Sequence, residues 1–323
     1  MAAKNEECNL ARKLDALRTF VYPASQLEVI VASDGSTDST PTILLSRGTD
    51  VVPVVLERSM GKAVALNAAV SRARNEILVF LDVRQQVDVL ALQALVQNFA
   101  DPLVGAVSGE LLLENADGSP AGDALGIYWK IEKGIRKLES LTGSVVGVTG
   151  AIYAMRRELF VDLPPGLILD DVLAPMLVAK QKRRVVFEPE AIARDQIFQQ
   201  RGKEFSRKVR TLTGNYQLLK LAPWLISPRN PILFRFVSHK LIRLLVPVFL
   251  ITLFVSSALA KGAAYKGVLF IQMIAYVLAT TGNFFPWTKR FKPVGIAVTF
   301  VMLNAAASVA LYNFLSRKEE VWI

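Results

Sequence analysis

The stretch that decides the fold is Leu27-Glu28-Val29-Ile30-Val31-Ala32-Ser33-Asp34-Gly35-Ser36-Thr37-Asp38. Its continuous β-branched run at 29–32 is typical of a strand covered on both faces in a parallel sheet. The loop that follows offers carboxylates, hydroxyls and backbone N–H groups, and Pro41 suits the first turn of a helix. Ligands of open α/β sheets bind beyond the carboxyl ends of the strands, so this loop is a candidate site. An ordinary capped turn is the alternative.

Apolar strand candidates alternate with helices over the first 220 residues. Besides 27–32, the pattern predicts strands at 51–56, 76–81, 104–113 and 151–155. It predicts helices at 4–20, 63–74, 89–99, 128–141 and 172–180, and a turn at 114–118. This alternation indicates a single α/β domain, to which we assign residues 1–222.

The C-terminal third differs in composition. The chain is 52% hydrophobic over its 323 residues, with a mean hydropathy of +0.35, and the apolar excess follows residue 237. About 20 residues cross a bilayer, so the stretches 244–260, 268–281 and 294–315 predict three transmembrane helices within 244–315. Residues 223–243 mix aromatic and basic side chains, as an amphipathic segment in the headgroup plane does, and 316–323 form a tail.

Charge and rare residues narrow the function classes. The net charge is +10, and many basic residues cluster at 201–243, which favours a membrane surface over nucleic acid as the partner. A single cysteine, Cys8, excludes an intrachain disulfide and a thiolate metal cluster. The single histidine, His239, beside the first apolar stretch, is read as an interfacial residue. Acid–base chemistry then falls to carboxylates.

Carboxylates follow several of the predicted strands. Asp34, Asp38, Asp82 and the pair Asp170-Asp171 all fall at predicted strand ends or in loops. Carboxylate oxygens together with phosphate oxygens and water suit Mg²⁺ or Mn²⁺. The sequence therefore predicts a divalent cation and a phosphate-bearing ligand at one edge of the sheet.

An ordered set of motifs resembles the inverting, membrane-anchored glycosyltransferases of family 2, which have the GT-A fold. These motifs are Asn5-Glu6-Glu7, the Asp-Gly-Ser-Thr-Asp loop at 34–38, and Gly61-Lys62-Ala63-Val64-Ala65-Leu66-Asn67. The resemblance covers about residues 4–220. It implies a Rossmann-like mixed sheet and a nucleotide-sugar donor, with Asn5, Glu7, Asp34 and Lys62 on the donor side. It also implies a multi-pass protein of the cell (inner) membrane with a cytosolic catalytic domain.

Two acidic motifs carry the chemistry that the resemblance implies. Asp82-Val83-Arg84 stands where the family has Asp-x-Asp, so Asp82 is implied to bind the metal with the donor diphosphate. Arg84 replaces the second carboxylate; it either contacts a phosphate or pairs structurally with Asp82. By the same correspondence Asp171 is the catalytic base that deprotonates the acceptor hydroxyl, and Asp170 is free to cap the helix 172–180.

The chain departs from the family in two places. The family's Gln-x-x-Arg-Trp motif is reduced to Arg210, which favours transfer of one or a few sugars over long-chain synthesis. The basic stretch 201–210 either contacts phosphate or lies on the membrane. The family's first strand precedes Asn-Glu-Glu, where only Met1 to Lys4 stand. We therefore expect a missing strand, which would leave 27–32 without a neighbour, and a truncated start.

The sequence thus favours a glycosyltransferase that moves a sugar, with inversion, to a lipid-linked or saccharide acceptor at the membrane. A nucleotidyltransferase is a second hypothesis, but it would need a Gly-rich, Arg-containing phosphate loop that we do not find. A degenerate, non-catalytic nucleotide-sugar-binding membrane subunit is a third, favoured by Arg84 and the reduced motif at Arg210.

Overall fold

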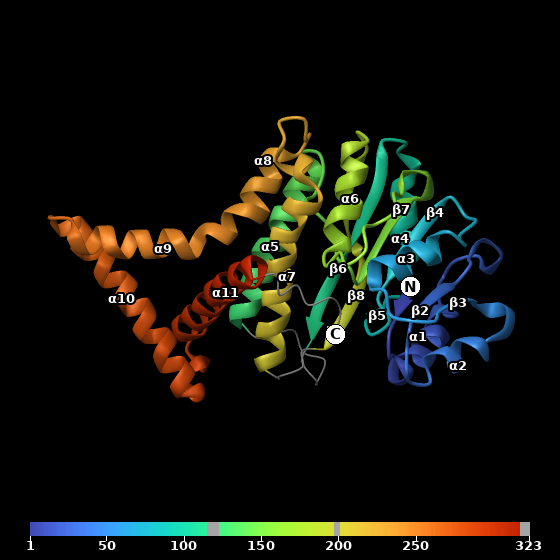
Figure 1. Cartoon of the computed structure of the whole chain (residues 1–323), viewed down its shortest axis with the longest axis horizontal. Helices are drawn as coiled ribbons and strands as arrows, with labels where there is room; N and C mark the ends of the chain where they lie inside the picture. The colour runs from blue at the N-terminus through green and yellow to red at the C-terminus, as the bar shows by residue number, and fades with distance from the viewer. Residues whose placement is uncertain (115–122, 197–200, 317–323) are drawn as a thin grey trace.

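The computed structural model describes residues 1–114, 123–196 and 201–316, and forms a mixed α/β domain followed by apolar helices (Figure 1). One sheet is parallel, in the order β1-β2-β3: β1 (Ala2–Ala3), β2 (Ile30–Asp34) and β3 (Val52–Leu56). The second sheet has the order β4-β7-β6-β8-β5, with β4 (Ile77–Leu81), β5 (Gln86–Val87), β6 (Val104–Glu114), β7 (Ile152–Arg156) and β8 (Arg184–Gln196). In it β6 and β8 run parallel, and the other pairs are antiparallel. The predicted Rossmann-like mixed sheet is confirmed.

The helices of this domain lie between the strands in sequence, except that α7 follows the last strand. They are α1 (Glu7–Leu17), α2 (Thr40–Leu45), α3 (Lys62–Val70), α4 (Ala91–Val96), α5 (Asp123–Leu141), α6 (Asp170–Lys180) and α7 (Arg201–Leu221). Each predicted helix is present, although α1, α3 and α4 are shorter than their patterns suggested. The predicted turn at 114–118 is outside the described residues except for Glu114, which ends β6.

Strand β8 was not predicted. Its apolar run Val185-Val186-Phe187 is followed by Glu188-Pro189-Glu190, which interrupts the pattern before Ala191. The strand nevertheless continues along β6, with an irregularity in register between Ser108 and Glu110. The interruption hid a long strand whose carboxyl end carries Asp195.

The expectation that β2 lacks a neighbour is wrong. The short strand β1 pairs with it in parallel, Ala2 beside Ala32 and Ala3 beside Ser33. The backbone of Met1 extends this pairing: its amine donates to the Ile30 carbonyl at 2.9 Å, and its carbonyl accepts from the Ala32 N–H at 2.9 Å. Beyond Met1 a cavity of about 480 Å³ lies between residues of β2 and β4.

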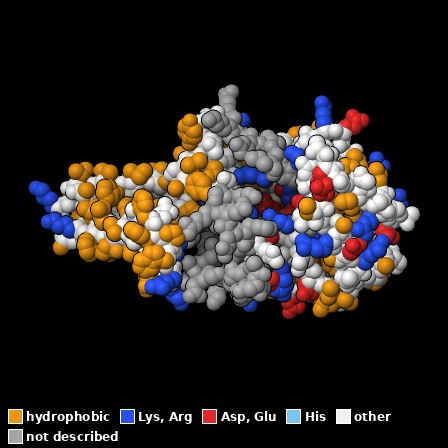
Figure 2. Space-filling view, turned by 90° about the horizontal axis from the view of Figure 1, so that it is seen from below, with side chains coloured by type: hydrophobic (Ala, Val, Ile, Leu, Met, Phe, Trp, Pro, Cys, Tyr) orange, Lys and Arg blue, Asp and Glu red, His pale blue; other side chains and the backbone are white. Residues whose placement is uncertain are grey.

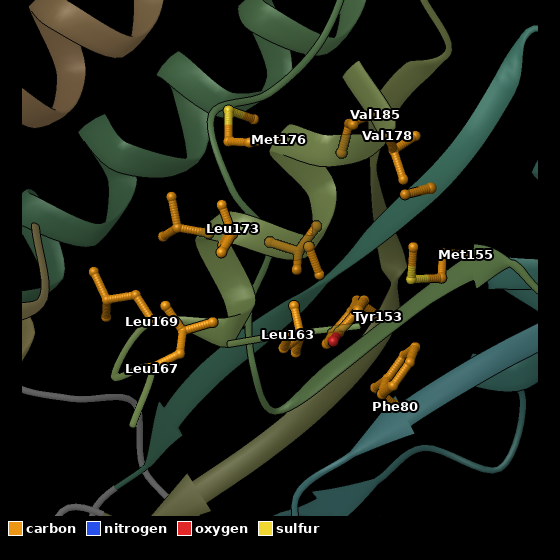
Figure 3. Packing of buried hydrophobic residues seen from close by; sticks show 14 of the residues in the cluster. Phe80, Tyr153, Met155, Leu163, Leu167, Leu169, Leu173, Met176, Val178 and Val185 are labelled. Atoms are coloured by element: carbon orange, nitrogen blue, oxygen red, sulfur yellow. The ribbon is translucent and has the colours of Figure 1, made fainter. Parts of the chain in front are cut away.

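The core fixes the start of α6 against the second sheet. Phe80 of β4 stacks on Tyr153 of β7 with ring centroids 4.5 Å apart, and Leu173 and Met176 of α6 belong to the same buried cluster (Figure 3). Because α6 is apolar on nearly every side and buried, its position is set by packing. The packing of α6 therefore also fixes the position of Asp170 and Asp171 in its first turn.

Small residues bring α3 close to the first sheet. Ala63, Ala65 and Ala69 are buried, and the helix packs against β1, β2 and β3. Gly61 precedes the helix at φ +94°, in the region that favours glycine. Gly61 is the N-cap residue of α3, so Lys62 is the first residue of the helix.

In the described part of the chain, three helices are long and apolar enough to cross a membrane. They are Leu233–Leu259, Ala263–Phe284 and Lys292–Leu315. The first joins α8 (Leu233–Phe236), a π-helical turn (Val237–Leu241) and α9 (Ile242–Leu259); the others are α10 (Ala263–Phe284) and α11 (Lys292–Leu315). They extend away from the sheets (Figure 1). The three predicted stretches lie within these helices, apart from Ala260.

Candidate active site

A cavity of about 570 Å³ lies where the ends of β4 and β8 meet helices α6, α7 and α11. Acidic and basic side chains gather in a hollow between the apolar helices and the sheets (Figure 2). The structure brings five of the predicted site residues into the lining of this cavity: Lys62, Asp82, Arg84, Asp171 and Arg210. Their segments lie far apart in sequence, so the cavity is a product of the tertiary fold.

Lys62 joins two of the acidic positions. Its ammonium lies 3.0 Å from Asp82 Oδ1, as a hydrogen bond, and 3.2 Å from Asp170 Oδ2. Burial alone would lower the pKa of Lys62, but the nearby carboxylates, Asp170 first, outweigh it and raise the pKa. The idea that Asp170 caps its helix is wrong, because Leu169 holds the N-cap position and Asp170, 4% exposed, turns to Lys62 instead.

Asp171 faces Asp82 across a glycine. An added Cβ at Gly150 would lie 3.6 Å from Asp171 Oδ2 and 3.8 Å from Asp82 Oδ2, so the missing side chain leaves space between the two carboxylates. The N–H of Val148 donates to the carbonyl of Asp171 at 2.8 Å and ties this Gly-rich segment to α6. Burial, and then the charge of Asp170, raise the pKa of Asp171 to about 6, although Lys62 opposes them.

Arg84 pairs with a carboxylate that the sequence did not single out. Its guanidinium forms an ion pair with Asp195, which is buried at the end of β8, and Gln85 Nε2 donates to the same oxygen at 3.2 Å. Asp82 pairs with Lys62 instead, so the proposed structural pair of Asp82 with Arg84 is wrong. A prediction of strand β8 would have placed Asp195 at a strand end and marked it as a candidate, but this strand was not predicted.

The remaining predicted residues build the loop after β2. Asn5 Oδ1 accepts from the Thr37 N–H at 2.9 Å, and Glu7 Oε2 accepts from the Ser39 N–H at 2.9 Å. Asp34 is fully buried as the last residue of β2, where it accepts hydrogen bonds from Ser59 Oγ and the N–H groups of Met60 and Gly61 at 2.7 to 3.0 Å. These residues shape the loop after β2, whereas Lys4 and Glu6 line the cavity.

Helix α7 carries a half-buried guanidinium, that of Arg210, at the cavity. The Nε of Arg210 is buried without a hydrogen bond, and among the described residues Arg210 has no ion-pair partner. Burial lowers the pKa of Arg210, and the charges of Asp170 and Asp171 oppose this. Arg207 and Lys208, from the basic stretch 201–210, also line the cavity. Further lining residues that sequence reasoning missed are Arg136, Thr299, Met302 and Leu303. The last three belong to α11, whose apolar pattern gave no hint of a second role.

The donor atoms fit a divalent cation shared with a substrate. Within residues 1–114, 123–196 and 201–316, no three His, Cys, Asp or Glu side chains form a ready-made metal site. Mg²⁺ is commonly held by one or two carboxylates together with substrate phosphates and water. The Asp82 carboxylate, 35% exposed at the cavity, suits such a site.

The mixed α/β arrangement of the two sheets, with acidic side chains at the cavity, is that of a GT-A-like domain. A family model described as Glycosyl transferase family 2 matches residues 1–163, and the chain belongs to that family. Members of the family are glycosyltransferases. The matched region includes Lys62, Asp82 and Gly150 but ends before Asp171 and Arg210.

Similar proteins agree with this assignment. The chain is 26% identical over 226 residues to a poly-beta-1,6-N-acetyl-D-glucosamine synthase of Staphylococcus aureus, covering 68% of this chain and 54% of that protein. It is 36% identical over 121 residues to a beta-monoglucosyldiacylglycerol synthase of Nostoc, covering 36% of this chain and 26% of that one. The chain thus spans about half the length of the first of these relatives.

A solved structure supports the fold. A mannosyltransferase from Pyrobaculum calidifontis, in complex with GDP-Man and Mn²⁺, superimposes with a TM-score of 0.71 at 23% identity. The match covers 97% of this chain and 85% of that one, so it extends into the apolar helices.

Proposed function

We propose that the protein is a membrane-bound glycosyltransferase that transfers a sugar, with inversion, from a nucleotide-sugar donor to a hydroxyl of a lipid-linked or saccharide acceptor. The observation that carries this proposal is the position of Asp171: it faces Asp82 across Gly150, in a cavity whose far wall is an apolar helix. One carboxylate is available to the donor diphosphate and the other to the acceptor.

Asp171 is the general base of the proposed reaction. Its pKa of about 6 leaves it mostly ionised at neutral pH, yet basic enough to accept a proton as the acceptor oxygen attacks. The new bond forms between that oxygen and the anomeric carbon. The bond from the anomeric carbon to the diphosphate breaks, and the nucleoside diphosphate leaves with the electron pair. A single displacement of this kind inverts the configuration.

The donor is held on the other side of the carboxylates. In the proposal the loop after β2, shaped by Asn5, Glu7 and Asp34, receives the nucleotide, and Lys62 orients Asp82 toward the diphosphate. Arg210 offers charge-assisted hydrogen bonds to a phosphate oxygen. Arg84, fixed by Asp195, holds a second positive charge at the same edge.

A divalent cation, Mg²⁺ or Mn²⁺, completes this donor site. Asp82 would hold it, and the bound cation would offset negative charge on the leaving diphosphate. The ion fits the local charge balance, since the carboxylates of Asp82 and Asp170 both pair with the same ammonium, that of Lys62.

Helices α9, α10 and α11 are proposed to cross the cell membrane, with the α/β domain in the cytosol. Their exposed surface is largely apolar (Figure 2), and α11 both packs against α7 and lines the cavity. An acceptor held in or near the bilayer would therefore reach Asp171 along α11.

The test is the substitution Asp171→Asn in the full chain. Loss of a general base costs about 10²- to 10⁴-fold in rate, so transfer should fall by that factor. Donor binding, measured by calorimetry, should persist, because the donor contacts remain. The matched control is Asp162→Asn, an exposed carboxylate outside the cavity.

Three outcomes would contradict the proposal. Unchanged transfer in Asp171→Asn would remove Asp171 from the role of base. Wild-type protein that binds donors but transfers no sugar to any lipid or saccharide acceptor would favour the non-catalytic subunit, and release of pyrophosphate would favour the nucleotidyltransferase.

A further inference from the structure

Helix α5 carries an exposed apolar face. Ile131, Ile135, Leu138 and Leu141 are 59%, 37%, 64% and 71% exposed, and their spacings of four, three and three residues place them on one side of the helix. A Cβ added at Gly134 would meet nothing within 4 Å, so this side stays open between them. Four large exposed apolar side chains in a row mark an interaction surface.

The opposite side of α5 faces the second sheet. Lys133 forms an ion pair of 2.6 Å with Glu110 of β6, and Ser140 Oγ accepts from the Phe187 N–H of β8 at 2.9 Å. At about 100° per residue, these two positions lie roughly half a turn from Ile131, Ile135 and Leu138. The apolar face therefore points away from the sheets.

A third side of α5 binds the segment that leads into α9. The ring nitrogens of His239 lie 3.1 Å from Glu132 and 3.1 Å from Glu139. The guanidinium of Arg235 donates to the carbonyls of Glu139 at 3.0 Å and Thr142 at 2.8 Å. These contacts fix α5 beside the beginning of the first candidate membrane helix, and α11 contacts α5 as well.

We propose that the face formed by Ile131, Ile135, Leu138 and Leu141 lies in the lipid bilayer, at the boundary between headgroups and acyl chains. The occupant is lipid because α5 is held beside the start of the first candidate membrane helix, where Ile242 and Leu245 are also 44% and 48% exposed. Figure 1 shows α5 between the sheets and the helices α9 to α11.

This placement sets the depth of the active site. Arg136 follows Ile135 directly and lines the catalytic cavity, so a helix half-sunk in the interface brings the cavity mouth to the level of the headgroups. The inference rests on the proposed membrane location of α9 to α11. It adds that the α/β domain itself contacts the membrane.

The experiment measures depth with a fluorescent label. In a full-length Cys8→Ser background, Ile135→Cys and Leu138→Cys each receive an environment-sensitive fluorophore, and the protein is placed in phosphatidylcholine vesicles that contain nitroxide-labelled lipids. Lys137→Cys, exposed on another side of α5, is the matched control. Phe249→Cys, 53% exposed on α9, reports whether that helix is in the bilayer.

We expect lipid quenching several-fold stronger at positions 135 and 138 than at 137, and strong quenching at 249. Quenching at 249 with positions 135 and 138 as accessible to aqueous iodide as 137 would overturn the placement of α5. Protection of 135 and 138 from both quenchers would overturn it in favour of a protein partner, such as a second copy. Absence of lipid quenching at 249 would overturn the membrane location and the inference together.

Discussion

The sheet side and the helical side of the candidate active-site cavity differ in how their charged groups are paired. On the sheet side, Asp82 and Asp170 both form ion pairs with Lys62, and Arg84 forms an ion pair with Asp195. On the helical side, Arg210 has a buried Nε without a hydrogen bond and no ion-pair partner within the described chain. Next to it stand the apolar residues of α11.

This difference suggests that the sheet side contributes mainly to stability and that Arg210 contributes mainly to ligand binding. Removal of one member of a matched buried pair leaves the other charge uncompensated, so the sheet side should contribute strongly to stability. A guanidinium without a partner contributes little to stability but is ready to bind an anionic ligand. Substitutions on the sheet side should therefore lower the unfolding free energy, whereas substitution of Arg210 should lower activity.

The largest stability effect is expected for Lys62→Ala. This change leaves the buried Asp170 and the neighbouring Asp82 without their cation, which costs about 3 to 5 kcal/mol of unfolding free energy. Urea denaturation of the full chain in detergent measures it. Lys62→Arg is the control and should retain most of the stability. A loss below about 1 kcal/mol for Lys62→Ala would break the distinction between the two sides.

On the helical side, Arg210→Gln should act on substrate and not on folding. We expect a change in unfolding free energy within about 1 kcal/mol, because Arg210 has no ion-pair partner among the described residues. A hydrogen bond to a charged group is worth about 1.5 to 3 kcal/mol, which corresponds to a loss of roughly 10- to 100-fold in kcat/KM. A variant that unfolds readily yet keeps full activity when folded would assign Arg210 to structure.

The sheet side was largely predictable from sequence because its contacts follow strand ends. The apolar run at 29–32 and the carboxylates after 76–81 and before 172 lie next to the patterns that position them. The structure brings Lys62, Asp82 and Asp171 to one cavity as expected. The loop at 34–38 differed in one respect: β2 continues through Asp34, which turns its carboxylate to residues 59–61.

The helical side could not be predicted in the same way. Thr299, Met302 and Leu303 belong to an apolar helix whose composition is fully explained by a membrane, so nothing in the sequence marks their second role at the cavity. Asp195 and the partner choice of Arg84 depended on β8, whose pattern is broken around Pro189. Such contacts join segments about 100 residues apart or more, and local periodicity carries no information about them.

The smallest expected effect is a shift in pH dependence within the carboxylate cluster. Asp171 must be ionised to act as base, so the rate of transfer should rise with pH through about 6 and fall about tenfold for each unit below it. Asp170→Asn removes a neighbouring negative charge that raises the pKa of Asp171, while Lys62 still lowers it. The pKa of Asp171 should then fall, and the acid limb of kcat/KM should move to lower pH.

A pH profile of kcat/KM for wild type, Asp170→Asn and the control Asp162→Asn measures this shift. Only the cavity variant should move, because Asp162 is exposed outside the cavity. An acid limb that stays in place in Asp170→Asn would mean that a different group supplies the base. An acid limb that moves to higher pH would mean that the Asp170 charge does not act on Asp171 directly, but through its hold on Lys62. In that case the ion pair of Lys62 with Asp170, and not the charge of Asp170 alone, would set the pKa of Asp171.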